Sequence, residues 1–188
     1  MAPIPPSDGR TLQAVGARRR VAGAPTSREL VERLRAESGR AATLVALFDA
    51  RSIAGERHLL SAWAHLGRAR SRGESRLRVR GAEFALWVAG DDQLPRALQK
   101  VGFTDASESF VLVAERPREL PALLESFGLA EDATAYPRPP DAHVLEQLGI
   151  SKEERDAVPP SAWEGLVLER VALLELSAAH GGAPTPKH

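Results

Sequence analysis

The stretch ATLVALFDARSIAGERHLLSAWAHLGRARS (residues 42–71) decides the fold class. Its first seven residues form an apolar run with β-branched members, which predicts a short buried strand. From about Ile53 the apolar residues recur at helical spacing as far as Ser71, and Gly73 follows as a stop signal. A buried strand that leads into a long helix favours an α/β or α+β domain.

The rest of the chain supplies similar patterns on both sides of this stretch. We expect further strands at 11–22 and 109–116, and helices at 25–39, 82–90, 93–102, 118–128 and 161–179. Ser27 is the expected N-cap of the first helix, and Gly39 its stop. The predicted fold is one small α+β domain over residues 11–178, a short mixed β-sheet packed with a majority of helices. The Pro- and Gly-rich tails, 1–10 and 179–188, are expected to be disordered.

Composition excludes several classes of protein. The 188 residues contain no cysteine, so disulfides, thiolate catalysis and zinc sites with Cys ligands are excluded. There is no run of about 18 apolar residues that would span a membrane. The first residues, MAPIPPSDGR, lack the apolar core of a secretory signal. We therefore expect a cytoplasmic protein.

The charge is zero overall but unevenly distributed. Residues 1–104 hold 18 Lys and Arg against 10 Asp and Glu, whereas residues 105–188 hold 7 against 15. Such asymmetry indicates either a basic surface for an anionic partner or two halves that attract each other within the fold.

The long predicted helix carries its basic residues on one face. At about 100° per residue, a quarter of its circumference holds Arg57, Ser61, His65, Arg68 and Arg72. Guanidinium groups in a row, beside a hydroxyl and an imidazole, suit contacts with phosphodiesters. The alternative is an ordinary solvated polar face. Aromatic residues are too scarce for continuous stacking of single-stranded bases.

Signatures of catalysis and of metal binding are missing from the sequence. The segment SIAGERH contains one Gly and no Lys, which excludes it as a phosphate-binding loop. His58 and His65 lie about 10.5 Å apart along a helix, too far to share one metal ion. We expect no catalytic residues, no metal and no cofactor. An enzyme built from a scattered site around Glu56 and His58 is a third alternative.

The C-terminal helix is apolar around most of its circumference. In LVLERVALLELS (residues 166–177), leucine and valine point to more than one side. Either the helix is buried on two sides within the fold, or one side is an interface.

Several of these residues also occur, in the same order, in a known family. The pattern consists of Phe48-Asp49-Ala50, Ile53-Ala54-Gly55, His58-Leu59, Arg68-Ala69, Gly73, Ala89-Gly90, Gln93-Leu94 and Gly102. Together with the C-terminal LVLERVALLEL, it resembles the smallest kinase-binding subunit of the KEOPS complex, the family of the PRPK-binding protein. The resemblance covers most of the chain except its two tails.

This resemblance implies a non-catalytic subunit of the complex that makes threonylcarbamoyladenosine in tRNA. It implies two partners, the atypical kinase/ATPase subunit and the single-stranded 3′ CCA end of tRNA. Phosphate contacts are then expected from Arg57, Arg68 and Arg72, with His65 on the same face and Arg70 reaching in from the core side.

Gly55 and Gly90 would admit a nucleotide close to the backbone, or serve only to end helices and pack closely. The kinase would dock on a stripe formed by Val167, Val171 and Leu174.

The chain departs from the family pattern at several positions. Asp92 stands where the family usually has Arg, and Arg96 lies one turn further along. Glu74-Ser75-Arg76 replaces a usual Asn-Ile-Ser, and Trp87 replaces Tyr. If Asp92 replaces a cation that contacts RNA or the kinase, that contact is affected here. Our alternative hypothesis, which Asp92 supports best, is a kinase-binding scaffold without RNA binding.

Overall fold

A computed structural model describes residues 11–20, 24–41, 43–116 and 119–180. Four strands form one sheet in the order β2-β3-β1-β4. Their bounds are β1 Gln13–Arg19, β2 Val45–Asp49, β3 Ser109–Ala114 and β4 Leu129–Glu131. Helices account for most of the remaining described residues, so the fold is a single small α+β domain, as predicted. The predicted tail 1–10 and most of 179–188 lie outside the described residues.

The sheet is antiparallel in all of its pairings, not mixed as we expected. β3 lies between β2 and β1, and β1 in turn pairs with β4 over Ala17–Arg19. β4 is only three residues long, and its sequence has no apolar alternation that would predict a strand.

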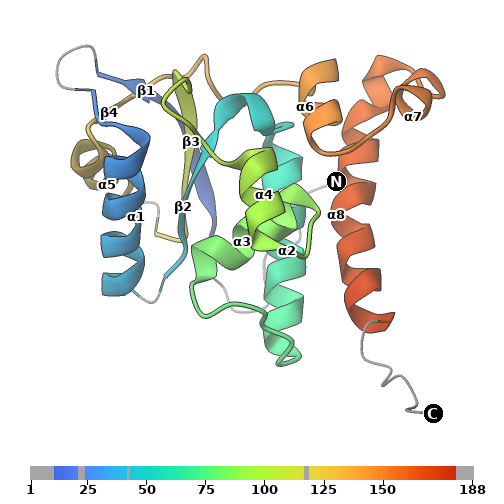
Figure 1. Cartoon of the computed structure of the whole chain (residues 1–188), viewed down its shortest axis with the longest axis horizontal. Coiled ribbons are helices and arrows are strands. Elements are labelled where there is room, and N and C mark those ends of the chain that lie inside the picture. The colour runs from blue at the N-terminus through green and yellow to red at the C-terminus, as the bar shows by residue number, and fades with distance from the viewer. Residues whose placement is uncertain (1–10, 21–23, 42, 117–118, 181–188) are drawn as a thin grey trace.

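Helices cover both faces of the sheet. Helices α1 (Ser27–Ala41) and α5 (Leu120–Phe127) lie on one face, and α2 (Glu56–Ser71) and α3 (Arg80–Ala89) lie on the other (Figure 1). Alternate strand residues separate accordingly, because successive side chains of a strand point to opposite faces. Val45 and Leu47 of β2 pack toward α1 and α5, whereas Ala46 and Phe48 pack toward α2 and α3.

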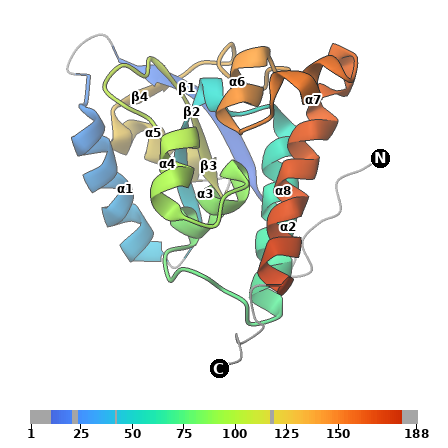
Figure 2. The ribbon, with the colours of Figure 1, turned by 45° about the vertical axis from the view of Figure 1, so that its right-hand side comes forward.

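The last helix forms an outer layer on the second face. Helix α8 (Trp163–His180) lies against α2 and runs in the same direction (Figures 1 and 2). It follows the short helices α6 (Ala142–Gln147) and α7 (Lys152–Asp156), and α4 (Leu94–Val101) packs on α3. Because α8 ends at His180, it extends two residues past the predicted domain boundary.

The first helix begins one residue earlier than its predicted cap implies. The Thr26 hydroxyl accepts a hydrogen bond from the Glu29 backbone N–H at 3.2 Å. The Glu29 carboxylate accepts one from the Thr26 backbone N–H at 2.7 Å. This reciprocal pair is a capping box, which makes Thr26 the N-cap in place of Ser27. The backbone N–H of Ser27 instead donates to Asp105 at 2.6 Å.

Candidate nucleic-acid and partner interface

The turn between β2 and α2 is held by a buried carboxylate. Asp49 accepts hydrogen bonds from the Arg51 backbone N–H at 2.9 Å and from the Ser107 hydroxyl at 2.6 Å. Burial raises the pKa of Asp49, but the hydrogen bonds from Arg51 and Ser107 outweigh burial and lower it overall. An ionised Asp49 therefore caps the short 3-10 helix Ala50–Ser52, which leads toward α2.

His58 joins the beginning of α2 to the end of α3. Its Nδ1 accepts a hydrogen bond from the Ala54 backbone N–H at 3.1 Å, and its Nε2 donates to the Val88 carbonyl at 2.8 Å. The side chain is completely buried, and this burial lowers the pKa of His58 to about 4. His58 is therefore neutral at pH 7, with its proton on Nε2.

At the two glycines expected to admit a nucleotide, protein atoms lie close to where a Cβ would stand. Gly55 has φ +104°, and a Cβ there would lie 3.1 Å from the Arg138 carbonyl oxygen. Gly90 caps α3 with φ +58°, and a Cβ there would lie 2.9 Å from the Arg170 side chain of α8. Both positions require glycine for backbone conformation and close packing. The alternative of helix ending and close packing thus accounts for both glycines, and their contact with RNA stays a prediction.

One carboxylate of α8 binds three side chains of the basic face. Glu175 contacts His65 at 2.5 Å, Arg68 at 3.2 Å and Arg72 at 2.8 Å. Burial raises the pKa of Glu175, but hydrogen bonds from Arg68 and Arg72 outweigh it and lower the pKa to about 2. Glu175 is therefore ionised, and it neutralises part of the predicted phosphate-binding face.

The other arginines of this region have carboxylate partners as well. Arg57 pairs with Glu164 of α8 at 2.7 Å, and Arg70 pairs with the fully buried Glu83 of α3 at 2.5 Å. Arg70 thus points into the protein, which corrects its expected role in a tRNA pocket. The guanidinium-bearing side chains of Arg57, Arg68 and Arg72 are still 66%, 49% and 43% exposed.

These pairs define what we call the α2–α8 seam: Arg57, His65, Arg68, Arg72, Glu164 and Glu175. Both Arg57–Glu164 and Arg68–Glu175 join residues 107 positions apart, because the two helices are parallel. Arg57 and Arg68 are eleven residues apart on α2, and Glu164 and Glu175 are eleven apart on α8. Because eleven residues complete about three helical turns, each pair lies on one side of its helix and the two pairs face each other in register. The matching spacing of charges on the two helices is a signal for these ion pairs. We missed it because each helix was considered separately. At this seam, the two oppositely charged halves of the chain attract each other.

His65 lies inside the seam and not on an open face. It is 8% exposed, and its ring stacks on that of Trp87, with centroids 5.5 Å apart. Burial lowers the pKa of His65, as does the nearby Arg68, whereas Glu175 opposes them. His65 therefore offers little surface for a direct contact with RNA in this arrangement of the seam.

The predicted kinase-docking stripe is part of the core. Val167, Val171 and Leu174 are 0%, 1% and 5% exposed and belong to the same hydrophobic cluster as α2 and α3. The side of α8 that reaches the surface instead carries Leu173 and Leu176, which are 42% and 57% exposed. Periodicity identified the apolar sides of the helix but not which of them faces the protein.

The Asp92 departure creates a small acidic pair around Arg96. Arg96 contacts Asp91 and Asp92, both at 3.0 Å, and Lys100 contacts Asp91 at 3.1 Å. Burial raises the pKa of Asp91, but hydrogen bonds from Arg96, from the Gln93 backbone and from Lys100 lower it to about 2. Arg96 is thus held by two carboxylates, which offset its positive charge.

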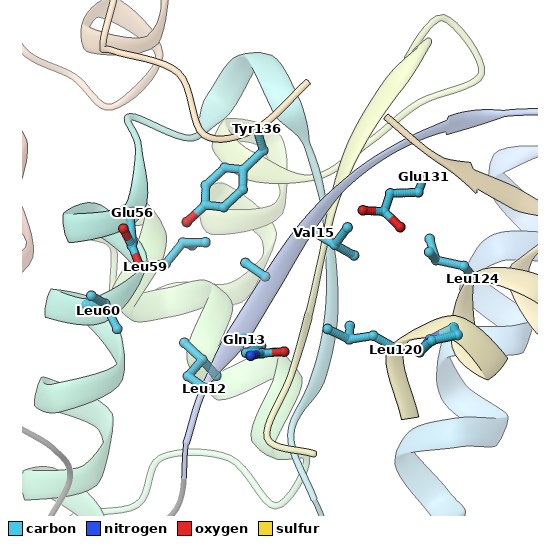
Figure 3. A pocket seen from close by; sticks show the side chains of 12 residues that line it. Leu12, Gln13, Val15, Glu56, Leu59, Leu60, Leu120, Leu124, Glu131 and Tyr136 are labelled. Atoms are coloured by element: carbon cyan, nitrogen blue, oxygen red, sulfur yellow. The ribbon is translucent and has the colours of Figure 1, made fainter. Parts of the chain in front are cut away.

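Glu56 and His58 do not converge on a common cavity. His58 is enclosed, whereas Glu56 is exposed and lines a surface groove of about 480 Å³ beside β1 (Figure 3). Within the described residues, no three His, Asp or Glu side chains are grouped so that they could hold a metal ion. No described helix is both long and apolar enough to cross a membrane.

Comparison of the whole chain with known protein families finds no match, and comparison with curated proteins finds none either. The geometry itself defines a small helix-rich α+β domain whose conspicuous polar feature is the charged α2–α8 seam.

Proposed function

We propose that this chain is a non-catalytic subunit of a KEOPS-type complex. It would bind the atypical kinase/ATPase subunit and recruit tRNA through the single-stranded 3′ CCA end for threonylcarbamoyladenosine modification. The observation that carries this proposal is the ordered residue pattern between Phe48 and Gly102. Two of its pieces lie close together, since His58 bonds to Ala54 on one side and, on the other, to Val88, the residue before Ala89-Gly90.

The RNA contact is proposed for the exposed edge of the seam. An arginine offers five N–H donors, and a single carboxylate contact leaves several of them available to a phosphate. Arg68 and Arg72 share Glu175, so two guanidinium groups face one carboxylate there. A phosphate that bound these arginines would compete with Glu175.

The kinase contact is proposed for the exposed side of α8. Leu173 and Leu176 are large apolar residues on the surface, and exposed apolar patches often mark protein interfaces. They lie three residues apart and therefore share one face of the helix. They replace the buried stripe of Val167, Val171 and Leu174 as the proposed docking residues.

The RNA contact is tested with a double variant, Arg68→Gln with Arg72→Gln. Glutamine removes the positive charges without placing new carboxylates beside Glu175. We expect tRNA affinity in a low-salt gel shift to fall at least tenfold, and the salt dependence of binding to weaken. The matched control is Arg28→Gln with Arg35→Gln on α1, which removes two exposed charges from the opposite face of the sheet. Equal affinity of the two double variants would contradict the assignment.

A second candidate function is a kinase-binding scaffold without RNA binding. The pairing of Arg57, Arg68 and Arg72 with carboxylates favours it, because neutralised cations attract phosphates weakly. Glu175→Gln separates the two functions. If the seam binds RNA, removing the competing charge raises tRNA affinity. If the chain is only a scaffold, neither Glu175→Gln nor the arginine variant changes the tRNA affinity, while kinase binding persists.

A further inference from the structure

The sheet has an open edge at the first half of β1. β3 pairs with β1 from Gln13 to Arg18, whereas β4 covers only Ala17–Arg19 on the other side. One more contact follows, in which the Gly16 carbonyl accepts a hydrogen bond from the Asp132 backbone N–H at 2.8 Å. Among the residues that the structure describes, no strand pairs with Gln13–Val15 on this side.

Ala14 presents its backbone groups at this open edge. In an antiparallel strand, the N–H and C=O of one residue point to the same neighbour, and those of the next residue point the opposite way. Gly16 points toward the β4 side, so Ala14, two residues away, points there too. A peptide laid along the edge would therefore find one donor and one acceptor on Ala14.

Two apolar walls flank the edge and would enclose an added strand. On one side, Leu59 and Leu60 of α2 stand beside Leu12; on the other, Leu120 and Leu124 of α5 stand beside Val15 (Figure 3). The groove between them has a volume of about 480 Å³. Both helical layers thus continue past the last paired strand, which leaves a strand-sized position with apolar surroundings on both faces.

The groove also has acidic side chains on its rim. Glu56 belongs to the α2 side and Glu131 ends β4 on the α5 side (Figure 3). No described residue forms a salt bridge with either carboxylate at 4.0 Å or less. Two acidic groups favour a basic partner and disfavour a second copy of this chain, whose own Glu56 and Glu131 would repel them.

We propose that this groove binds an extended segment of a partner protein, which adds to β1 as a further strand of the sheet. The segment pairs with the Ala14 backbone, places alternate apolar side chains against α2 and α5, and carries Lys or Arg at its ends opposite Glu56 and Glu131. Backbone pairing supplies affinity, and the two walls and the rim supply specificity, as in other cases of β-strand addition. This site uses a different side of α2 from the seam, and the proposal is independent of the function proposed above.

The test uses the full chain and a fluorescein-labelled peptide, Val-Ile-Thr-Val with a lysine on each side. A peptide with glutamate in place of lysine is its control. We expect saturable binding of the lysine peptide, read by fluorescence anisotropy, and at least tenfold weaker binding of the glutamate peptide. Hydrogen exchange at the Ala14 amide should slow when the lysine peptide binds, while the Val113 amide in the buried ladder stays unchanged.

Variants distinguish strand addition from other modes of binding. Ala14→Pro removes the outward N–H, which an edge strand tolerates, and we expect at least a tenfold loss of affinity. Ala14→Gly keeps the N–H and should bind within about twofold of the parent chain. Should Ala14→Pro fail to fold, Glu131→Lys serves instead. Because Glu56 keeps its charge, the preference for the lysine peptide over the glutamate peptide should be lost.

Three results would overturn the proposal. One is unchanged binding in both Ala14→Pro and Glu131→Lys. Another is an Ala14 amide already protected in the free chain at low concentration, which would assign the groove to a segment of the same chain. The last is protection that rises with protein concentration alone, which would assign the groove to a second copy.

Discussion

The Nε2 atom of His58 donates a hydrogen bond to the backbone carbonyl of Val88 across 2.8 Å, although the two residues are 30 positions apart in the chain. Because its other nitrogen bonds to the Ala54 backbone, this fully buried ring links Ala54 to Val88, the residue before Ala89-Gly90. His58 therefore stabilises the surface proposed for binding without contacting a ligand itself.

Stability should fall as the pH drops from about 6.5 to 4. The pKa of His58 is lowered to about 4 in the folded protein, so over this range the unfolded chain binds more protons. The loss from His58 is at most about 3 kcal/mol. It is measured as the free energy of urea unfolding against pH. In His58→Gln the slope should be shallower. A remainder comes from His65, whose pKa is lowered too, and, as the pH approaches 4, from carboxylates such as Glu175. An equal slope in the variant would contradict the buried, neutral imidazole.

Substitution by alanine should have opposite effects on stability at two glycines within helices. A Cβ at Gly81 of α3 would lie 2.2 Å from the Val45 carbonyl oxygen, so Gly81→Ala should destabilise the protein by about 1–3 kcal/mol. Gly67 of α2 has open space around it, and Gly67→Ala should stabilise by about 0.5–1 kcal/mol through helix propensity. Thermal unfolding of both variants measures the difference. Similar shifts of Tm would refute the close approach of α3 to β2.

Loss of the shared carboxylate should weaken the attachment of α8. Glu175→Gln removes the charge that binds Arg68 and Arg72, and we expect a loss of about 1–2 kcal/mol in the free energy of unfolding. Glu169→Gln, at an exposed position of the same helix, serves as the control and should change stability by less than about 0.5 kcal/mol. High salt should shrink the difference between the two variants. A difference that salt leaves untouched would argue against an electrostatic seam.

Aspartate substitutions on α8 should separate its core side from its surface side. Val171→Asp buries an unpaired charge and should cost about 3–5 kcal/mol of stability. Leu176→Asp falls on an exposed position and should leave Tm nearly unchanged while it reduces co-purification with the kinase. Circular dichroism and pull-down measure the two effects. A pull-down undiminished by both Leu173→Asp and Leu176→Asp would remove this face from the proposed interface.

The secondary structure follows from local sequence signals because those signals are strong. The apolar run before Asp49 and the helical periodicity after Gly55 place β2 and α2 close to where they were predicted. β4 was missed because Leu129–Glu131 has only its pairing with Ala17–Arg19 to define it. The antiparallel order of the sheet also depends on contacts between distant segments, which no local pattern encodes.

The site was harder to predict because it depends on partners from another helix. A helical projection correctly groups Arg57, Arg68 and Arg72, but it does not show that Glu164 and Glu175 pack against them. The apolar stripe at Val171 was likewise real, yet it faces α2 and not the solvent. In both cases residue type and periodicity identified the right residues. Which element packs against them determined whether they are paired, buried or exposed.

The most direct test of the proposed function compares the binding of two tRNAs to the chain co-expressed with the proposed partner, the atypical kinase/ATPase subunit. One tRNA is intact, and the other lacks its 3′ CCA end. We predict that the complex binds the intact tRNA at least tenfold more tightly, and that Arg68→Gln with Arg72→Gln abolishes this preference. Equal binding of the two tRNAs by the parent complex would contradict recruitment through the 3′ end.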